Sequence, residues 1–263
     1  IEDLIEIISP PENDKVIFIW PEGILPGVFQ KQLKKYGYLF KDTFNENHLL
    51  VLGIDSKLEK NQSYEHFNSF SIYDHNLNLI NSYNKVDLVP FGEFLPFEKI
   101  LKNIGIKTIT NSYQSYSKGE KREIIEINQN KFNLKILPLI CYEIIYSGRI
   151  FKNNDFDFII NISEDGWFGS SIGPRQHFVH SIYRAIESGK YVLRSSNNGI
   201  TAIINPVGVI EKQISLDKFG YIDFTESKKI KSTLFSQFGN KIFLLIILLY
   251  IFFIFSFNRI KNE

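Results

Sequence analysis

Three residues stand where the chain leaves apolar runs, and their side chains together can transfer an acyl group. Glu22 ends the motif WPE, Lys85 ends the motif YNK, and Cys141 lies within LICYE as the only cysteine of the chain. A thiol can attack a carbonyl carbon, a carboxylate can accept the thiol proton, and an ammonium can stabilise the oxyanion that forms. These residue types therefore indicate nucleophilic acyl transfer before any fold is considered.

Each of these residues, taken alone, also has an ordinary structural explanation. A lone cysteine is often an inert, buried apolar side chain. Glu22 can cap a helix, and Lys85 can be a surface lysine at the end of a strand. Only the joint pattern favours the catalytic interpretation.

No metal or cofactor is indicated by the remaining polar motifs. His177 and His180 lie three residues apart on an expected helix, but no carboxylate or cysteine is in register with them, so a structural role is favoured over a metal site. The glycine-rich segment 166–173 lacks the Gly-Lys-Ser/Thr of a phosphate-binding loop.

The composition allows a sizeable core and gives no sign of a nucleic-acid partner. The chain has 263 residues, 44% of them apolar, and a formal net charge of +1. This length suits one large domain or two small ones, and a nearly neutral chain has no bulk field that would attract nucleic acid. A single cysteine excludes an intrachain disulfide. Because the chain begins at Ile1 and contains no methionine, we expect a fragment or a processed piece.

Apolar runs and turn residues predict alternating strands and helices. Helices are expected at 27–38, 143–152 and 176–188, and strands at 15–20, 48–54, 68–73, 77–83, 123–127, 131–137, 155–162, 191–195, 200–205 and 207–213. Such a mixture predicts a layered α/β domain.

Two features of the predicted order of strands and helices concern the candidate site. Cys141 falls at a strand-to-helix turn, where a helix start and Lys85 are expected to favour the thiolate. Residues 86–119 form a long irregular stretch with several glycines and prolines, and loops of this length are usually functional or disordered.

The C-terminal segment 242–257 is uncharged and lies between Lys241 and Arg259. The 17 residues between these two charges make a helix of about 26 Å, against a hydrocarbon core of about 30 Å. We expect a transmembrane helix at 240–258 whose flanking charges snorkel to the interface, followed by a short tail at 259–263. A buried core helix is the alternative, disfavoured because the segment is apolar on all sides. Basic residues on both sides leave its orientation undetermined.

Taken in order, the motifs resemble the apolipoprotein N-acyltransferase family, a branch of the nitrilase or carbon–nitrogen hydrolase superfamily. The resemblance covers roughly residues 10–257. The matching motifs are WPE with Pro26, NK at 84–85 leading to LVPFGE at 88–93, ICYE at 140–143, DGWFG at 165–169 with GPRQH at 173–177, and RSSNNGIT at 194–201. An ordered set of this kind is far more specific than any one of its motifs.

The resemblance implies a fold, a location and a reaction. The fold would be a nitrilase-type α-β-β-α sandwich over residues 1–235, with its first strand missing before residue 1, on the periplasmic face of a bacterial inner membrane. The reaction would move a fatty acyl chain from a phospholipid, through a thioester on Cys141, to the N-terminal amine of a diacylglyceryl-cysteine apolipoprotein. The implied partners are thus a phospholipid, an apolipoprotein and the membrane lipid.

The resemblance also implies roles for individual residues. Glu22, Lys85 and Cys141 would be the catalytic triad, and the remaining lining residues would be Glu93, Tyr142, Glu143 and Trp167. Glu143 could instead be an acid in the first turn of a helix, and Glu93 a solvated loop charge. For Trp167, a wall or gate for acyl chains is weighed against a loop anchor.

The sequence departs from the family in three respects, which keep other functions open. Gly23 stands where Ser or Thr is usual, and Asp87 stands where a basic residue is usual. The 263 residues do not include the multi-helix membrane domain that family members carry upstream. One alternative is a carbon–nitrogen hydrolase, an amidase or nitrilase that uses the same triad with water as acceptor. Another is an inactive, truncated remnant. The apolar C-terminal segment and the long loop at 86–119 favour the acyltransferase.

Overall fold

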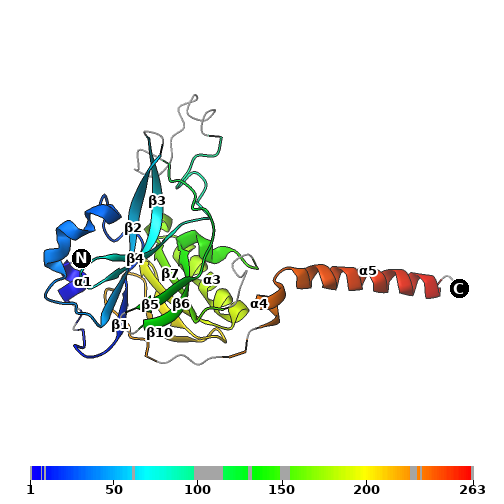
Figure 1. Ribbon diagram of the computed structural model, residues 1–263. Helices are drawn as coiled ribbons and strands as arrows, with labels where there is room; N and C mark the ends of the chain where they lie inside the picture. The colour runs from blue at the N-terminus through cyan, green and yellow to red at the C-terminus, as the bar shows by residue number, and fades with distance from the viewer. Residues whose placement is uncertain are drawn as a thin grey trace.

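The first of two β-sheets carries two of the three candidate catalytic residues at its strand ends. The computed structural model describes residues 2–6, 8, 10–60, 63–97, 115–129, 132–148, 155–225, 230–231 and 233–261. In this part of the chain the sheet has the order β1-β2-β3-β4 (Figure 1). Its strands are β1 (Val16–Ile19), β2 (His48–Lys60), β3 (Ser63–Asp74) and β4 (Leu79–Asn84). β1 runs parallel to β2, and the other pairs are antiparallel.

The second sheet carries the candidate nucleophile. Over the described residues its order is β10-β9-β8-β7-β6-β5, with β6, β7 and β8 parallel and the outer pairs antiparallel. Helix α3 (Gly173–Ser188) makes the crossover from β7 to β8 that a parallel pair requires. The strands are β5 (Ile125–Gln129), β6 (Phe132–Ile140), β7 (Phe158–Glu164), β8 (Tyr191–Asn197), β9 (Thr201–Ile204) and β10 (Ile210–Ile214).

Alternation of side chains along the strands produces the layers. On β2, Leu49 and Val51 enter the core between the sheets, whereas Leu50 and Leu52 enter a separate core on the outer face. Successive strand residues point to opposite faces, so a strand that is apolar throughout must be covered on both sides. The continuous burial of β2 from His48 to Ile54 therefore reflects its position between two layers.

The second sheet is covered in the same way. Ile136 and Ile140 of β6 face the first sheet, whereas Leu137 and Leu139 face Phe178 and other apolar residues of α3. The outer face of the first sheet is covered by η1 (Gln30–Leu39), with α1 (Glu2–Glu6) beside it. The result is a helix–sheet–sheet–helix order of layers, and the expected α/β architecture is confirmed.

Two of the expected helices differ from the structure. The segment expected as a helix at 27–38 is the 3₁₀ helix η1, whose period of three residues per turn aligns Leu33, Tyr36 and Leu39 on the covered face. The helix expected at 143–152 is wrong in its described part. It is a short 3₁₀ helix, η2 (Cys141–Ile145), followed by extended backbone at Tyr146. Residues 149–152 of the expectation lie outside the described residues.

The C-terminal helices leave the layered body through a short, well-anchored segment. Helix α4 (Leu234–Phe238) begins at Thr233, whose hydroxyl caps the helix and also donates to the carbonyl oxygen of Glu187 on α3. The amide of Asn240 donates to the carbonyl oxygen of Ser147 at 3.3 Å. Helix α5 (Lys241–Lys261) then extends away from the sheets (Figure 1).

The transmembrane helix expected at 240–258 is not supported by the structure. Over the described residues, no helix combines the length and the apolar character that crossing a membrane requires. The expectation relied on snorkelling charges to extend a helix of about 26 Å across about 30 Å of hydrocarbon.

Candidate active site

A buried ammonium lies at the centre of the candidate site. Lys85 follows β4 and is only 1% exposed. Its Nζ lies 2.8 Å from Oε1 of Glu93 and 3.5 Å from Oε1 of Glu22. A buried charge is costly unless it is paired, and here two carboxylates share one cation. Burial works against the charged form, but the two carboxylates outweigh it and hold the pKa of Lys85 well above its ordinary value.

Asn68, a residue that the sequence did not single out, holds the two carboxylates together. Its side-chain nitrogen donates to Oε1 of Glu22 at 2.5 Å and to Oε1 of Glu93 at 2.9 Å. Asn68 lies on β3 among buried residues. Its only signal in the sequence is a polar amide within a buried strand, which many proteins carry for other reasons.

Glu22 reaches this cluster because the chain after β1 crosses over β2 at a glycine. The backbone N–H of Gly53 donates to the carbonyl oxygen of Pro21 at 3.3 Å. A Cβ atom on Gly53 would lie 2.4 Å from the Cα atom of Glu22, so only glycine permits this approach. The second oxygen of Glu22 accepts a hydrogen bond from the backbone N–H of Glu164 at 2.8 Å. That bond joins the carboxylate to the end of β7 in the other sheet.

Cys141 follows β6 in a left-handed backbone conformation, with φ of 48°. Its side chain is buried, and Sγ lies 3.9 Å from the carbonyl oxygen of Glu164. Burial raises the pKa of the Cys141 thiol to about 12; the charge of Glu22 adds to the rise, and Lys85 opposes it. The structure thus brings the thiol into the field of the other two groups. Lys85 favours the thiolate, as expected, but burial and the charge of Glu22 outweigh it, so the net shift is opposite to the one expected.

Glu143 ties the two strand ends that carry Lys85 and Cys141. It is fully buried, and its Oε2 accepts from the backbone N–H of Ile140 at 2.9 Å. Its Oε1 accepts hydrogen bonds from Tyr83 Oη at 2.6 Å, Val86 N at 2.8 Å, Asp87 N at 3.1 Å and Arg122 Nη2 at 3.2 Å. Through these contacts Glu143 links the end of β6 in the second sheet to the end of β4 in the first sheet. Asp87, one of the departures from the family pattern, pairs with the same Arg122 at 2.6 Å.

The other residues expected to line the site differ in their placement. Glu93 is buried beside Lys85, and its Oε2 also accepts from the backbone N–H of Val89 at 2.9 Å. Tyr142 is half-buried and makes an edge contact with Tyr146, with ring centroids 5.5 Å apart. Trp167 is 62% exposed on η3 (Gly166–Phe168), directly after β7. Glu93 therefore belongs to the charged cluster, whereas Trp167 belongs to the surface near the Cys141 end of the sheet.

A second buried network lies beside Cys141, and the sequence had assigned its histidine only a structural role. Asp165 Oδ1 accepts from Ser163 Oγ at 2.7 Å and lies 2.8 Å from His177 Nδ1. Asp165 Oδ2 accepts from Arg194 Nη2 at 2.6 Å. Burial opposes ionisation of this carboxyl, but the hydrogen bond to His177 and the charge of Arg194 outweigh it and lower the pKa of Asp165.

The other nitrogen of His177 points back to the nucleophile. His177 Nε2 lies 3.2 Å from the carbonyl oxygen of Cys141. Over the described residues, no group of three or more histidine, cysteine or acidic side chains has the arrangement of a metal site. The arrangement as a whole offers a thiol, a neighbouring carboxylate and a fixed ammonium, which are the groups that acyl transfer through a covalent intermediate requires.

Comparison with protein families and curated proteins agrees with this chemistry. Residues 8–224 match the family model "Carbon-nitrogen hydrolase". The chain is 36% identical to the apolipoprotein N-acyltransferase of Rickettsia prowazekii (strain Madrid E) over 228 residues, which are 85% of this chain and 44% of that protein. It is 38% identical to the protein of that name from Rickettsia bellii (strain RML369-C) over 260 residues, or 97% of this chain and 50% of that protein. The chain thus spans about half the length of these curated relatives.

Solved structures share the architecture at much lower identity. Nit3 of Saccharomyces cerevisiae, a member of branch 10 of the nitrilase superfamily, is 18% identical, covers 82% of this chain and 78% of its own, and has a TM-score of 0.53. XC1258 of Xanthomonas campestris, a CN-hydrolase superfamily protein, is 17% identical, covers 82% of this chain and 79% of its own, and has a TM-score of 0.52. These similarities support the nitrilase-type α/β fold.

Proposed function

This chain belongs to the carbon–nitrogen hydrolase family, and from that premise we propose that it is the acyl-transferring domain of an apolipoprotein N-acyltransferase. The observation that carries the proposal is the buried ammonium of Lys85 between Glu22 and Glu93, within the electrostatic reach of the only thiol. The names of the Rickettsia relatives support the choice of acyl transfer within the family.

In the first half-reaction the thiol of Cys141 attacks the ester carbonyl of a phospholipid. Glu22 accepts the thiol proton as the carbon–sulfur bond forms, and the ammonium of Lys85 stabilises the oxyanion of the tetrahedral intermediate. When the intermediate collapses, the carbon–oxygen bond breaks and the proton passes from Glu22 to the departing alkoxide. The products are a thioester on Cys141 and a lysophospholipid.

In the second half-reaction the N-terminal amine of a diacylglyceryl-cysteine apolipoprotein attacks the thioester. Glu22, again a carboxylate, accepts a proton from the attacking nitrogen, and Lys85 again stabilises the oxyanion. The carbon–sulfur bond then breaks, and the departing sulfur recovers a proton from Glu22. An amide is formed and the thiol is regenerated, which completes a ping-pong cycle.

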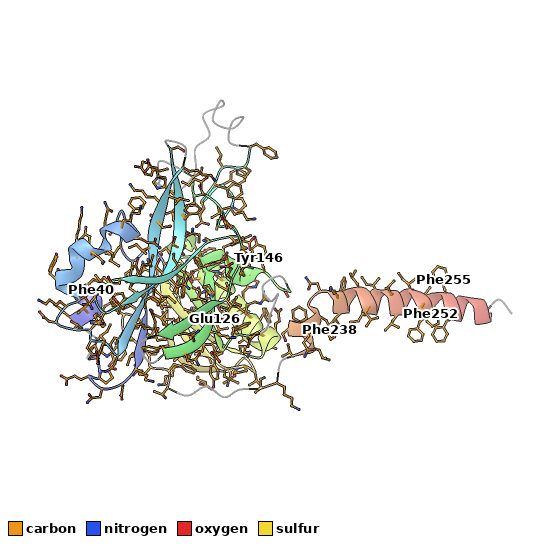
Figure 2. All side chains as sticks on the ribbon, viewed as in Figure 1. Phe40, Glu126, Tyr146, Phe238, Phe252 and Phe255 are labelled. Carbon is orange, nitrogen blue, oxygen red and sulfur yellow. The ribbon has the colours of Figure 1, made fainter. Side chains whose placement is uncertain are left out.

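We further infer that the domain works at a lipid surface, the periplasmic face of a bacterial inner membrane. Most of the described side chains of α5 are large, apolar and exposed. They are Phe243, Leu244, Leu245, Ile246, Leu248, Leu249, Tyr250, Ile251, Phe252, Phe253, Ile254, Phe255 and Phe257. Figure 2 labels two of them, Phe252 and Phe255, on the part of the helix that projects from the body. Exposed apolar surface of this extent marks a membrane or protein interaction site.

Mass spectrometry of the intact chain tests the reaction. After incubation with dipalmitoyl phosphatidylethanolamine vesicles, we expect a palmitoyl-sized adduct on the wild-type chain. The adduct should be absent in Cys141→Ser and strongly reduced in Glu22→Gln. It should disappear when a peptide with a free diacylglyceryl-cysteine amine is added, and that peptide should gain the same mass.

The matched control is Glu126→Gln, which neutralises an exposed carboxylate on β5 and should leave the adduct unchanged. Release of ammonia from small amides, with no adduct, would assign the chain to the hydrolases of the same family. A folded chain that forms neither product would contradict acyl transfer by this domain alone.

A further inference from the structure

The backbone of the nucleophile is held in a conformation that its own sequence does not favour. Cys141 has φ of 48°, and a residue with a side chain in this left-handed region costs about 1–3 kcal/mol unless its surroundings impose the conformation. The residues before and after Cys141 continue β6 and η2. The constraint therefore has to come from contacts with the peptide groups at Cys141.

Two contacts fix the backbone here, one at the residue before Cys141 and one at its own carbonyl group. Glu143 Oε2 accepts the backbone N–H of Ile140 at 2.9 Å, and His177 Nε2 lies 3.2 Å from the carbonyl oxygen of Cys141. Glu143 belongs to the same short helix as Cys141, so it moves with the turn. His177 lies on α3, a helix of 16 residues packed on the second sheet, and so fixes the turn to the body of the domain.

The ring of His177 is itself fixed. Its Nδ1 faces Asp165 Oδ1 at 2.8 Å, and Arg194 and Ser163 hold that carboxylate in place. The ring of Phe168 lies 5.6 Å from the imidazole. Arg194 Nη2 also lies 3.3 Å from the same Nδ1, so charged or polar groups hold the ring at both nitrogens.

We propose that His177 is a positioning residue for the acyl-transfer chemistry, which fixes the carbonyl group of Cys141 and thereby holds the sulfur near Glu22 and Lys85. The physical consequence follows from geometry: a displacement of about 1 Å in a reacting group can cost about 100-fold in rate. One of its two tests, the rate of thioester formation, rests on the proposed function. The other, alkylation of Cys141, depends only on the position of the thiol.

Two substitutions distinguish the contact made by Nδ1 from the contact made by Nε2. In His177→Asn the amide nitrogen takes the place of Nδ1, so the contact with Asp165 remains and the contact with Cys141 is lost. In His177→Gln the amide nitrogen takes the place of Nε2 and the contact with Cys141 remains. His180→Asn and His180→Gln, three residues along the same helix, are the matched controls, and thermal melts confirm that each variant is folded at the assay temperature.

The first measurement is the pH profile of alkylation of Cys141 by iodoacetamide, followed by intact mass; as the only cysteine, Cys141 gives an unambiguous label. We expect His177→Asn to shift the profile to lower pH, towards that of an ordinary thiol, because a released turn no longer keeps the sulfur in its buried position. His177→Gln should keep the wild-type profile. The second measurement is thioester formation from phospholipid, where His177→Asn should lose roughly 100-fold in kcat with little change in KM.

The outcomes decide between the alternatives. If His177→Asn matches the wild type in both measurements, or if His177→Gln is impaired as much as His177→Asn, then the contact with Cys141 does not position the nucleophile and the inference is overturned. If no variant, including the wild type, forms a thioester while the alkylation profiles of the two variants still separate, the proposed function fails and the positioning role stands.

Discussion

At the scale of single residues, the site is organised around an excess of negative charge. Two carboxylates, Glu22 and Glu93, surround one ammonium, Lys85, so the cluster carries a formal charge of −1 while the thiol is neutral. A thiolate would add a third anion in a buried place. We therefore expect Cys141 to be a thiol at rest. In the proposed reaction its proton would pass to Glu22 as the new bond forms.

This resting state predicts how Cys141 responds to pH. Because the pKa of the thiol is raised to about 12, the thiolate fraction increases about tenfold per pH unit throughout the range roughly pH 7 to 10. We expect the rate of alkylation by iodoacetamide to rise over the whole of that range without a plateau. The urea-unfolded chain is the control and should level off near the ordinary thiol value of about 8.5. A plateau at that pH in the folded chain would show that the sulfur is not desolvated.

We expect the loss of the Lys85 ammonium to lower the free energy of unfolding by a large amount. Lys85→Met leaves two buried carboxylates without their cation, and breaking a buried pair in this way costs about 3–5 kcal/mol. Lys60→Met is the matched control, because its ion pair with Glu65 is exposed and pairs of that kind contribute about 0–1 kcal/mol. Urea unfolding of both variants measures the difference, and equal losses would contradict the central role of Lys85.

Asp165 gives a prediction with a defined pH dependence. Its pKa is lower in the folded chain than in the unfolded chain, so its contribution to stability is complete above the unfolded value of about 3.9 and is lost as pH falls below it. Asp165→Asn should lower the free energy of unfolding at pH 7 by about 3–5 kcal/mol. The difference from the wild type should shrink as the pH falls below about 4. A difference that stays constant from pH 7 to roughly pH 3 would exclude the ionised form as its source.

The residues of the site were predictable from the sequence only where a motif marked them. Glu22, Lys85 and Cys141 stand in ordered motifs, and the structure brings them together. Asn68 has no motif, because its importance arises from two carboxylates that are 46 and 25 residues away. His177 lies within a motif, but its contact with the carbonyl of Cys141 depends on the packing of α3, which local sequence does not encode.

At the scale of elements, alternation and turn chemistry were the informative signals. Asp74 Oδ1 accepts the backbone N–H groups of Asn76 at 2.9 Å and Asn78 at 2.8 Å, and this side-chain turn joins the antiparallel strands β3 and β4. The strands were therefore found near their observed positions. The 3₁₀ helices were not, because the apolar spacing of three to four residues fits either helix type, and the packed neighbours decide between them.

Because the chain after β1 passes close to Gly53, we expect a larger residue at position 53 to displace the segment that carries Glu22. Gly53→Ala places a methyl group 2.4 Å from the Cα atom of Glu22, so the segment after β1 has to shift. We expect a loss of stability of about 1–3 kcal/mol and a fall of at least about 100-fold in thioester formation. Gly37→Ala is the control, since an added Cβ at Gly37 meets no atom within 4 Å and should leave the rate unchanged. A normal rate in Gly53→Ala would mean that Glu22 can act from a displaced backbone.

At the scale of the whole molecule, two sheets and a projecting helix have separate tasks. The sheets assemble the charged cluster from strand ends in both layers, while α4 anchors α5 to the body through Thr233 and Asn240. The layered body was predictable, because strands that are apolar on both faces need cover on both faces. The path of the C-terminal helix away from the body was not, since it depends on those few anchoring contacts.

We expect that a chain without residues 241–263 no longer binds lipid, while its two sheets remain folded. We expect the shortened chain to stop co-sedimenting with phosphatidylcholine vesicles, because the exposed apolar side chains of α5 are gone. Its thermal midpoint and its alkylation profile should match those of the full chain, since the anchoring contacts of Thr233 and Asn240 remain. A point variant, Phe252→Asp with Phe255→Asp, should reproduce the loss. Undiminished sedimentation of both forms would place the lipid contact elsewhere on the domain.

The desolvated sulfur of Cys141 has a consequence for redox chemistry. Disulfide exchange and oxidation by peroxides both proceed through the thiolate, and the folded domain keeps that form scarce. In an oxidising compartment the chain can therefore retain a reduced nucleophile without a reductase to restore it. The same desolvation that slows activation of the thiol protects it between turnovers.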